Sequence, residues 1–445
     1  MFEFYVTTDE KNLFQRERSP YSGEANEYQV NVNSKKTYQI IDGWGTSFTD
    51  SSAYLIDQCL SEKHQNEIME AVFDVERGIG LSILRNPMGA SDYARYIYSY
   101  DDIETDETDE KLIHFSIAHD EESIIPLTKH AMALNPDLKL FASPWSAPGW
   151  MKDSRQMIGG KLLPKYYDTY ALYFKKVIES YHQHNIDIYA ITPQNEPLFL
   201  PPHYPGMEML ADEQVTFVAE HLKPLFEKSG IETKIFGYDH NWDRVDYPLE
   251  LLDKAEAAFD GIAWHWYGGN VINQSRVALF YPDKEIHFTE GSGGEWIPAF
   301  EPAFSNLMRT GIEIFRNGAK SMTLWNLALD ENNGPTVPGF GKSTCRGLVT
   351  VNQRTQEYSF TLDYFGLAHF SKFVRPGAVR IASSSDQNIR SVAFQNTDQS
   401  IVVILFNDRE NDAQVSVVID SSTLETINLP AKSAMTIIDT LKNEE

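Results

Sequence analysis

"IDIYAITPQNEP", residues 186–197, begins as an apolar stretch and ends in an amide, a carboxylate and a proline. Other stretches share this layout, in which an apolar or β-branched beginning leads to a polar, aromatic or glycine-containing tip. The full set is "YQIIDGWGTSFTD" (38–50), "LSILRNPMGAS" (81–91), "LKLFASPWSAP" (138–148), "IDIYAITPQNEP" (186–197), "TKIFGYDHN" (233–241), "GIAWHWYGG" (261–269), "EIHFTEGSGG" (285–294) and "KSMTLWNLALD" (320–330). The layout predicts eight strands, each buried along most of its length.

Segments with helical spacing separate these strands, among them residues 166–185, 211–230 and 304–318. In 211–230 the apolar residues recur at steps of three and four, at Val215, Val218, Leu222 and Phe226. Strands that alternate with helices pair in parallel through right-handed crossovers. Eight such units predict an α/β fold of the (β/α)₈ TIM-barrel type.

A doubly wound open sheet is the alternative architecture. It normally has a glycine-rich turn directly after its first strand. The segment "GIGLSI" (78–83) instead precedes its strand and lacks the third glycine. The barrel is therefore the preferred fold.

The alternation of strands and helices stops after about residue 372, where short strands follow one another without helices between them. They are "NIRSVAFQN" (388–396), "SIVVILFND" (400–408), "AQVSVVID" (413–420) and "AKSAMTIID" (431–439). This pattern predicts an antiparallel β-sandwich. "NEYQVNVNSKK" (26–36) also alternates and is expected to add a strand to it. We therefore predict a catalytic barrel over 38–371 and a sandwich domain formed by 1–37 and 372–445.

The charge of the chain limits its partners. Its formal net charge is −26 and its pI is about 4.8. Repulsion opposes association with nucleic acid or anionic lipid, so a neutral or cationic ligand is expected. The beginning lacks a cationic leader followed by an apolar run, and no stretch of about 18 apolar residues occurs. These features predict a cytoplasmic protein without a membrane span, and they do not indicate an oligomeric state.

Metal and cofactor motifs are sparse. The two cysteines, Cys59 and Cys345, form no C-x-x-C pair, and the twelve histidines include no H-E-x-x-H pair. "GSGG" (291–294) lacks the Gly-Lys-Ser pattern of a phosphate-binding loop. We expect neither a metal ion nor a cofactor.

In a TIM barrel the active site lies at the C-terminal ends of the strands, so the polar tips should converge. In chain order the tips contain Asp50, Arg85, Trp145, Asn195, Glu196, Asp239, His240, His265, Tyr267, Glu290, Trp325 and Asn326.

Two carboxylates stand out among these tips, Glu196 after the fourth strand and Glu290 after the seventh. Paired carboxylates suit glycoside hydrolysis, where one protonates the leaving oxygen and the other meets the positive charge that develops on the sugar carbon. Aromatic tips supply flat faces that suit sugar rings.

Other interpretations remain open. Each tryptophan could simply fill core, and His265 could be a hydrogen-bonded barrel histidine. A non-catalytic carbohydrate-binding protein would keep the aromatic residues but could lack either carboxylate. An aldolase would need a lysine at a strand tip, and none lies beside these residues.

The sequence resembles glycoside hydrolase family 30, the group that includes lysosomal glucosylceramidases and microbial β-1,6-glucanases. The motifs that carry the resemblance occur in the family's order along nearly the whole chain. They are "DGWGTSFTDSSAYLI" (42–56), "LRNPMGASDY" (84–93), "ASPWSAPGWMK" (142–152), "ITPQNEP" (191–197), "HWYGG" (265–269), "FTEGSGG" (288–294), "LWNLALD" (324–330) and "GLAHFSKFVRPGAVRI" (366–381).

The resemblance implies a retaining β-glycosidase on a (β/α)₈ barrel flanked by a β-sandwich, with Glu196 as acid/base and Glu290 as nucleophile. It places further residues around the sugar, namely Asp50, Trp145, Asn195, Tyr267, Trp325 and Asn326. It also implies that Arg85 and His265 support the nucleophile and its neighbourhood. Retention predicts carboxyl groups about 5–5.5 Å apart.

The implied substrates are β-glucosides, including β-1,6-linked gluco-oligosaccharides or glucosylceramide-like glycosides. A β-xylosidase or β-fucosidase of the same family is the alternative. "LFLPPHYPGMEML" (198–210) departs from the lysosomal pattern, and "GYDHNWD" (237–243) is more similar to the microbial branch.

Overall fold

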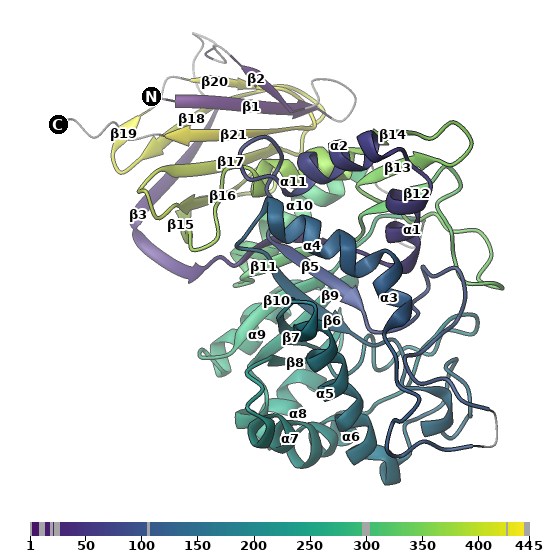
Figure 1. The fold of residues 1–445 in the computed structure, drawn as a ribbon. Coiled ribbons are helices and arrows are strands. Elements are labelled where there is room, and N and C mark those ends of the chain that lie inside the picture. Colours follow the sequence, from purple (N-terminus) through teal and green to yellow (C-terminus); the bar gives the residue numbers. More distant parts are fainter. Residues whose placement is uncertain are drawn as a thin grey trace.

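The chain folds into a barrel and a smaller sheet domain, shown by the computed structural model in Figure 1. The structure describes residues 2–8, 14–17, 21, 27–104, 107–295, 303–423 and 426–439. Parts of the predicted sandwich segments 1–37 and 372–445 therefore lie outside the described residues, namely 1, 9–13, 18–20, 22–26, 424–425 and 440–445.

Eight parallel strands close into a ring, which confirms the predicted TIM barrel and rules out the open sheet. Around the ring these are β4 (Gly43–Ser47), β5 (Ile83–Pro87), β6 (Lys139–Ser143), β7 (Ile188–Ile191), β8 (Lys234–Trp242), β9 (Gly261–Gly269), β10 (Glu285–Glu290) and β11 (Ser321–Asn326). β11 pairs with β4 and closes the barrel. Every strand lies within one of the predicted stretches, apart from the last residue of β8.

The helices between the strands cover the outside of the barrel (Figure 1). The α-helices are α1 (Asp50–Gln58), α2 (Glu62–Phe73), α3 (Ala118–Glu122), α4 (Ile124–Leu134), α5 (Tyr167–Gln183), α6 (Ala211–Thr216), α7 (Lys223–Ser229), α8 (Asp246–Ala255), α9 (Ile272–Phe280), α10 (Ala303–Arg316) and α11 (Leu362–Ser371). Short 3₁₀ turns occur at η1 (Gly149–Met151), η2 (Pro164–Tyr166) and η4 (Glu256–Ala258).

The predicted helix 211–230 is interrupted in the middle. A π-helical turn, η3 (Phe217–Leu222), separates α6 from α7, and Lys223 N–H donates to the carbonyl of Val218. Pro224 follows directly and has no N–H to continue the α-helical ladder, which explains the local widening. Gly230, at φ 67°, ends α7 in the left-handed conformation.

A small three-stranded sheet follows the last barrel strand. It contains β12 (Ala328–Asp330), β13 (Val349–Asn352) and β14 (Glu357–Phe360). The sequence pattern did not predict this sheet. It fixes both ends of the segment 331–348, which returns over the mouth of the barrel.

Ten hydrogen-bonded strands form the second domain, in the order β19-β18-β3-β15-β16-β17-β21-β1-β2, with β20 paired to β18. Their bounds are β1 (Phe2–Thr8), β2 (Gln15–Glu17), β3 (Tyr28–Ile40), β15 (Val379–Ser383), β16 (Ile389–Gln395), β17 (Ile401–Asn407), β18 (Ala413–Ile419), β19 (Ser422–Thr423), β20 (Ile427–Leu429) and β21 (Ser433–Asp439).

Residues from opposite parts of this sheet share one core. Phe4 and Val6 of β1 belong to the same buried cluster as Val415 and Val417 of β18. The sheet must therefore fold over on itself, which makes the domain a sandwich.

Two features of the sandwich differ from the prediction. β3 and β18 pair in parallel, whereas the other paired strands of the sheet are antiparallel. β3 also continues to Ile40, beyond the predicted boundary at 37/38, because Ile40 pairs with Val379 of β15. Residues 38–40 thus belong to the sandwich, and the first barrel strand begins at Gly43.

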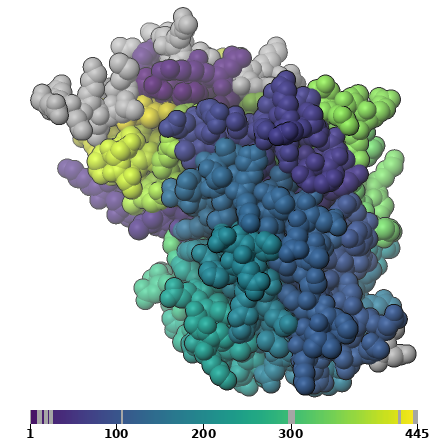
Figure 2. Space-filling model, viewed as in Figure 1, coloured from purple at the N-terminus to yellow at the C-terminus, as the bar shows by residue number. Residues whose placement is uncertain are grey.

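Helices α10 and α11 join the two domains, because both contact strands of the sandwich, and the two domains pack directly against each other (Figure 2). Arg309 of α10 donates to both carboxylate oxygens of Asp408, at 2.8 and 3.0 Å. His369 of α11 is fully buried between Thr436 and Thr7, and burial lowers its pKa to about 3. Among the described residues, none of the helices has the length and hydropathy that crossing a membrane requires.

Candidate active site

A cavity of about 320 Å³ lies where the C-terminal ends of the barrel strands meet. Glu196 follows β7, Tyr267 lies in β9, Glu290 ends β10 and Trp325 lies in β11. The whole lining comprises Asp92, Tyr93, Glu196, Phe199, Tyr204, His240, Asn241, Tyr267, Glu290, Trp325, Phe340, Ser343 and Cys345. The expected convergence of the strand tips is therefore observed.

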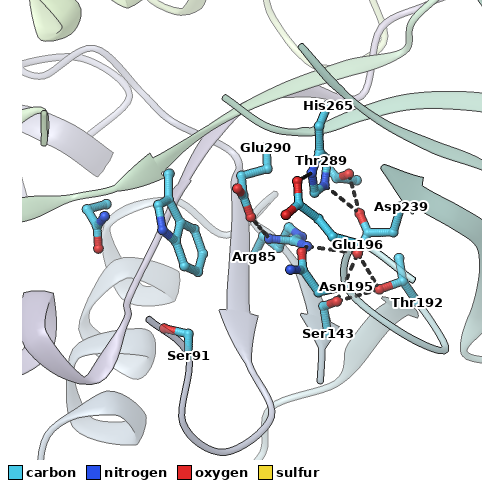
Figure 3. Close-up of polar contacts among 12 residues, drawn as sticks. Arg85, Ser91, Ser143, Thr192, Asn195, Glu196, Asp239, His265, Thr289 and Glu290 are labelled. Atoms are coloured by element: carbon cyan, nitrogen blue, oxygen red, sulfur yellow. Dashed lines mark hydrogen bonds and ion pairs between the residues drawn. The ribbon is translucent and has the colours of Figure 1, made fainter. Parts of the chain in front are cut away.

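Glu196 and Glu290 approach each other across the mouth of the barrel (Figure 3). One carboxylate oxygen of each, together with a ring nitrogen of His265, lies within 4.8 Å of the others. Both carboxylates can therefore reach the same small ligand.

Arg85 is a buried cation that connects three of the polar tips. Its Nη1 donates to Glu290 Oε2 at 2.9 Å, and its Nη2 donates to Asn195 Oδ1 and to Asp239 Oδ2, both at 2.8 Å. The guanidinium also lies over Trp145, 5.0 Å from the centre of its ring. These contacts fix the orientation of the Glu290 carboxylate.

Asp239 is the centre of the network in Figure 3. Besides Arg85, three hydroxyls donate to its carboxylate, those of Thr289 and Thr192 at 2.6 Å and that of Ser143 at 2.9 Å. Burial alone would raise the pKa of Asp239, but the positive charges of Arg85 and His265 hold it well below its usual range. Asp239 is therefore ionised at the floor of the site, a role that sequence reasoning did not give it.

His265 connects Asp239 to Glu196. Its Nε2 lies 3.0 Å from Asp239 Oδ1 and its Nδ1 lies 3.2 Å from Glu196 Oε1. Burial opposes a charge on this ring, but the fields of Glu290 and Asp239 outweigh it and raise the pKa of His265 to about 9. His265 is thus an imidazolium near neutral pH, and its direct contact is with Glu196 rather than with Glu290.

Glu196 sits in an environment that favours its protonated form. Burial is the first cause that raises its pKa, and the negative charges of Glu290 and Asp239 raise it further against the hydrogen bond from His265.

The backbone at Glu196 is unusual as well. Glu196, Tyr238 and Asp239 have φ of 45°, 73° and 61°, and Glu196 N–H donates to the carbonyl of Asp239. Non-glycine residues in this conformation cluster at functional sites.

Aromatic side chains form one wall of the cavity. Trp145 and Trp325 stack with ring centres 4.8 Å apart, and Trp325 is the one that faces the cavity. Tyr267 also faces it and donates its hydroxyl to Glu290 Oε1 at 3.0 Å. Glu290 therefore receives a hydrogen bond on each oxygen, from Tyr267 and from Arg85.

Several predicted site residues lie behind the cavity wall. Arg85, Trp145 and His265 contact residues that line the cavity, and Asn195 accepts a hydrogen bond from Arg85. Asn326 is buried, with its Oδ1 accepting a hydrogen bond from Thr49 at 2.9 Å.

Asp50 differs most from expectation, because its carboxylate is occupied by Arg95 Nη2 and His119 Nε2, each at 2.8 Å. Burial by itself would raise the pKa of Asp50, but the hydrogen bonds from His119 and Arg95 lower it to about 2. Asp50 and Asn326 are therefore not among the described residues that line the cavity, and both hold loops behind its wall, so their placement around the sugar stays a prediction.

The aspartate on the cavity wall is Asp92, which sequence reasoning missed although it belongs to the quoted motif "LRNPMGASDY". Burial raises its pKa to about 8, with further contributions from Glu290 and Glu196. Its Oδ1 has no hydrogen-bond partner within the described part of the chain. Asp50 acts on this loop indirectly, because its Oδ2 accepts the backbone N–H of Arg95 at 2.7 Å.

Within the described part of the chain, two groups of side chains have the spacing of metal ligands, but their surroundings do not favour a cation. In Glu196, His265 and Glu290 the charged imidazolium offers no lone pair. The second group, Asp42, Glu285 and His287, lies at the opposite end of the barrel, where three lysines already contact the two carboxylates.

The chain matches two descriptions of known domains. Residues 41–374 match the glycosyl hydrolase family 30 TIM-barrel domain, and residues 377–437 match the β-sandwich domain of the same family.

Individual relatives agree with these matches. An endo-1,6-β-D-glucanase of Trichoderma harzianum is 30% identical over 420 residues, which cover 89% of this chain and 84% of the relative. The lysosomal acid glucosylceramidase of Mus musculus is 27% identical over 432 residues, covering 90% and 81%. A solved endo-β1,6-glucanase superposes with a TM-score of 0.88 at 30% identity and covers 98% of both chains.

The domain matches span nearly all of the barrel and most of the sandwich, and the paired carboxylates lie where the barrel strands end. The chain belongs to glycosyl hydrolase family 30 and is a glycoside hydrolase.

Proposed function

We propose that this protein is a retaining β-glycosidase in which Glu290 is the nucleophile and Glu196 the acid/base. The observation that carries the proposal is the approach of a Glu196 oxygen to within 4.8 Å of a Glu290 oxygen. Retaining enzymes hold these groups about 5–5.5 Å apart, whereas inverting enzymes need about 6.5–9.5 Å to admit a water. The spacing favours direct attack by one carboxylate.

In the first step Glu290 attacks the anomeric carbon while Glu196 protonates the leaving oxygen. Arg85 and Tyr267 bind one oxygen each of Glu290, which aims the carboxylate. The raised pKa of Glu196 favours the protonated form that the first step requires. The ring of Trp325 supplies a flat wall for the sugar.

In the second step water releases the sugar from Glu290. The glycosyl ester carries no negative charge, so one of the causes that raise the pKa of Glu196 disappears. Glu196 then accepts a proton from the attacking water, and Glu290 leaves as a carboxylate. His265, held by Asp239, donates to Glu196 and stabilises the charge that Glu196 acquires.

We propose β-glucosides as substrates, with β-1,6-linked gluco-oligosaccharides first among them. Two endo-β-1,6-glucanases share about 30% identity with this chain, which supports this choice. No lysine or arginine is among the described residues that line the cavity, so a neutral sugar fits better than an anionic one.

A glucosyl lipid is the second candidate. Phe199 and Leu200 follow the acid/base and are 45% and 44% exposed, which would suit an apolar leaving group. Turnover of β-1,6-linked glucose disaccharides compared with glucosylceramide decides between the two. A panel of nitrophenyl β-glucoside, β-xyloside and β-fucoside tests the identity of the sugar itself.

Replacement of Glu290 tests the mechanism. Glu290→Ala should abolish turnover of aryl β-glucosides, and azide should restore it with formation of an α-glycosyl azide of inverted configuration. Glu232→Ala, at an exposed glutamate before β8, serves as the control and should behave as wild type. A β-glycosyl azide would instead assign Glu290 as the acid/base, and unchanged activity in the variant would remove it from the chemistry.

A further inference from the structure

The cavity wall beside Glu196 contains groups that the proposed chemistry does not use. Phe199 is the first of them. Its backbone N–H donates to the carbonyl of Glu196 at 2.9 Å, which closes a tight turn whose first residue has φ 45°. The turn fixes a half-exposed aromatic ring at the mouth of the cavity, three residues after the proposed acid.

His240 is the second group. Its Nε2 lies 3.8 Å from Glu196 Oε1, and its Nδ1 has no hydrogen-bond partner among the described residues. Burial, together with the positive charge of His265, lowers the pKa of His240 to about 3. The ring is therefore neutral and offers one donor and one acceptor.

Tyr204 is the third group. Its ring packs edge-on against Phe340, with centres 5.2 Å apart, while its hydroxyl makes no hydrogen bond within the described part of the chain. Burial raises the pKa of Tyr204, and the negative fields of Asp92, Glu196 and Glu290 raise it further. The phenol therefore lies within the field of all three carboxyl groups of the cavity.

We propose that Phe199, Tyr204 and His240 form the subsite for the leaving group, and that it takes a neutral pyranose unit. The inference rests on the proposed function, because the proton donor, Glu196, marks the position of the leaving oxygen. Phe199 offers an apolar face to the C–H face of a sugar, while His240 and Tyr204 offer hydrogen bonds to its hydroxyls.

The same subsite should bind an acceptor sugar in the second step. A hydroxyl of the acceptor attacks the anomeric carbon, the bond to Glu290 breaks, and the hydroxyl proton passes to Glu196. The products are a new glycoside and the free Glu290 carboxylate. Occupancy of the subsite by sugar then competes with hydrolysis by water.

Two conservative variants, Tyr204→Phe and His240→Gln, test the proposal with two substrates. One is a β-1,6-linked glucose disaccharide, and the other is 2,4-dinitrophenyl β-glucoside, whose leaving group needs neither a proton nor a sugar site. Each variant should lower kcat/KM for the disaccharide about tenfold, the value of one lost hydrogen bond. The aryl glucoside should change less than about twofold.

The partitioning of the glycosyl-enzyme between transfer to a sugar and hydrolysis by water gives an independent measurement. With the aryl glucoside as donor and glucose as acceptor, both variants should form less transfer product relative to hydrolysis than wild type. Tyr358→Phe is a matched control, because Tyr358 lies in β14 of the small sheet and donates its hydroxyl to Glu67 of α2, and neither residue lines the cavity. This control variant should leave unchanged the ratio of transfer product to hydrolysis product, and also the ratio of kcat/KM between the disaccharide and the aryl glucoside.

Phe199→Ala and Leu200→Ala separate a sugar site from a lipid site. Phe199→Ala should impair the disaccharide selectively, and Leu200→Ala should not. Equal losses on both substrates would place Tyr204 and His240 in general support of the fold and overturn the proposal, and so would unchanged kinetics. Failure of the proposed function is distinguishable, because the wild-type protein would then hydrolyse neither substrate.

Discussion

At the N-terminal end of the barrel Asp42 and Glu285 lie among three lysines, whereas at the C-terminal end Arg85 contacts Asp239 and Glu290, and His265 contacts Glu196. Lys139 contacts Asp42 at 2.6 Å, Lys234 contacts Glu285 at 2.9 Å, and Lys320 contacts Glu285 at 2.6 Å and Asp42 at 3.4 Å. Each end also holds one fully buried histidine, His287 or His265.

The two ends of the barrel differ in the number of cations that lie near their carboxylates. Among the lysines, burial would raise the pKa of Glu285, but hydrogen bonds from His287, Lys320 and Lys234 lower it. His287, whose pKa burial lowers, stays neutral. At the other end burial, with the neighbouring carboxylates, raises the pKa of Glu196, and the carboxylates Glu290 and Asp239 raise the pKa of His265. Similar residue types thus give a structural network at one end and groups ready for proton transfer at the other.

Removal of the negative charge of Asp239, at the C-terminal end of the barrel, should lower kcat more than any other change proposed below. Asp239→Asn keeps the shape of the side chain but deprives Arg85 and His265 of their shared partner. Both groups should lose their alignment with Glu290 and Glu196, and kcat should fall about 100-fold or more. Steady-state kinetics on an aryl β-glucoside measure this effect.

Asp42→Asn is the matched variant at the other end of the barrel. It should lower the melting temperature because Lys139 loses its partner, while kcat stays near the wild-type value. If Asp42→Asn reduced kcat as strongly as Asp239→Asn, the division of roles between the two ends would be wrong.

The two ends should also respond to opposite changes of pH. Glu196 must be protonated to donate to the leaving oxygen, and its pKa is raised. The value of kcat/KM should therefore fall on the alkaline side, by about tenfold for each pH unit above that pKa. A profile of kcat/KM from pH 4 to 10 measures it, and an activity that is constant to pH 10 would contradict the role of Glu196.

Glu285 has a lowered pKa in the folded state, so its contribution to stability is present above its unfolded pKa and is lost as pH falls. Melting temperatures should decline on the acid side, and Glu285→Gln should flatten that decline. The contribution of His265 to stability depends on pH in the opposite direction. Its pKa is raised to about 9, so its contribution is complete below its ordinary pKa and is lost as pH rises through about 9.

The barrel and its candidate catalytic carboxylates could be predicted because the strands run in parallel, so that all their polar ends lie at the same end of the barrel. Apolar stretches with polar ends set the strands, and closure brings the ends of β7 and β10 together, with Glu196 and Glu290. Asp50 and Asp92 lie outside the strands, at the start of α1 and in a loop, where strand alternation does not determine the direction of a side chain. Sequence reasoning therefore named Asp50 and missed Asp92, which is the one that lines the cavity.

Long-range pairing limited the rest of the prediction. The parallel contact of β3 with β18 joins residues nearly 400 positions apart, and local pattern carries no signal for it. The cavity wall also depends on Tyr204 and Phe340, whose rings meet between two loops of irregular conformation. Such contacts form only after the barrel has placed both loops.

Removal of one tyrosine hydroxyl at each end of the barrel should also affect kcat differently. Tyr267→Phe removes a hydrogen bond to a charged oxygen of Glu290, so kcat should fall about 10- to 100-fold. Tyr189→Phe is the counterpart at the other end, where the hydroxyl accepts from Lys234 at 2.8 Å. Its kcat should remain within about twofold of wild type, and comparable losses in both variants would remove the contrast.

Lys320→Met should have the smallest effect on catalysis and a clear effect on stability. Lys320 contacts both carboxylates of the N-terminal network, so its loss leaves Glu285 and Asp42 with one lysine each. The free energy of unfolding should fall by about 1–3 kcal/mol, since all these groups are largely removed from water. Urea titration measures this, and Lys63→Met, at an exposed lysine 3.6 Å from Glu67, should change it by less than about 0.5 kcal/mol. Among the described residues, Arg85 and His265 are the cations that contact Glu196, Asp239 and Glu290, so kcat should be unaffected. A loss of activity at unchanged stability would mean that the two ends are electrostatically coupled through the barrel.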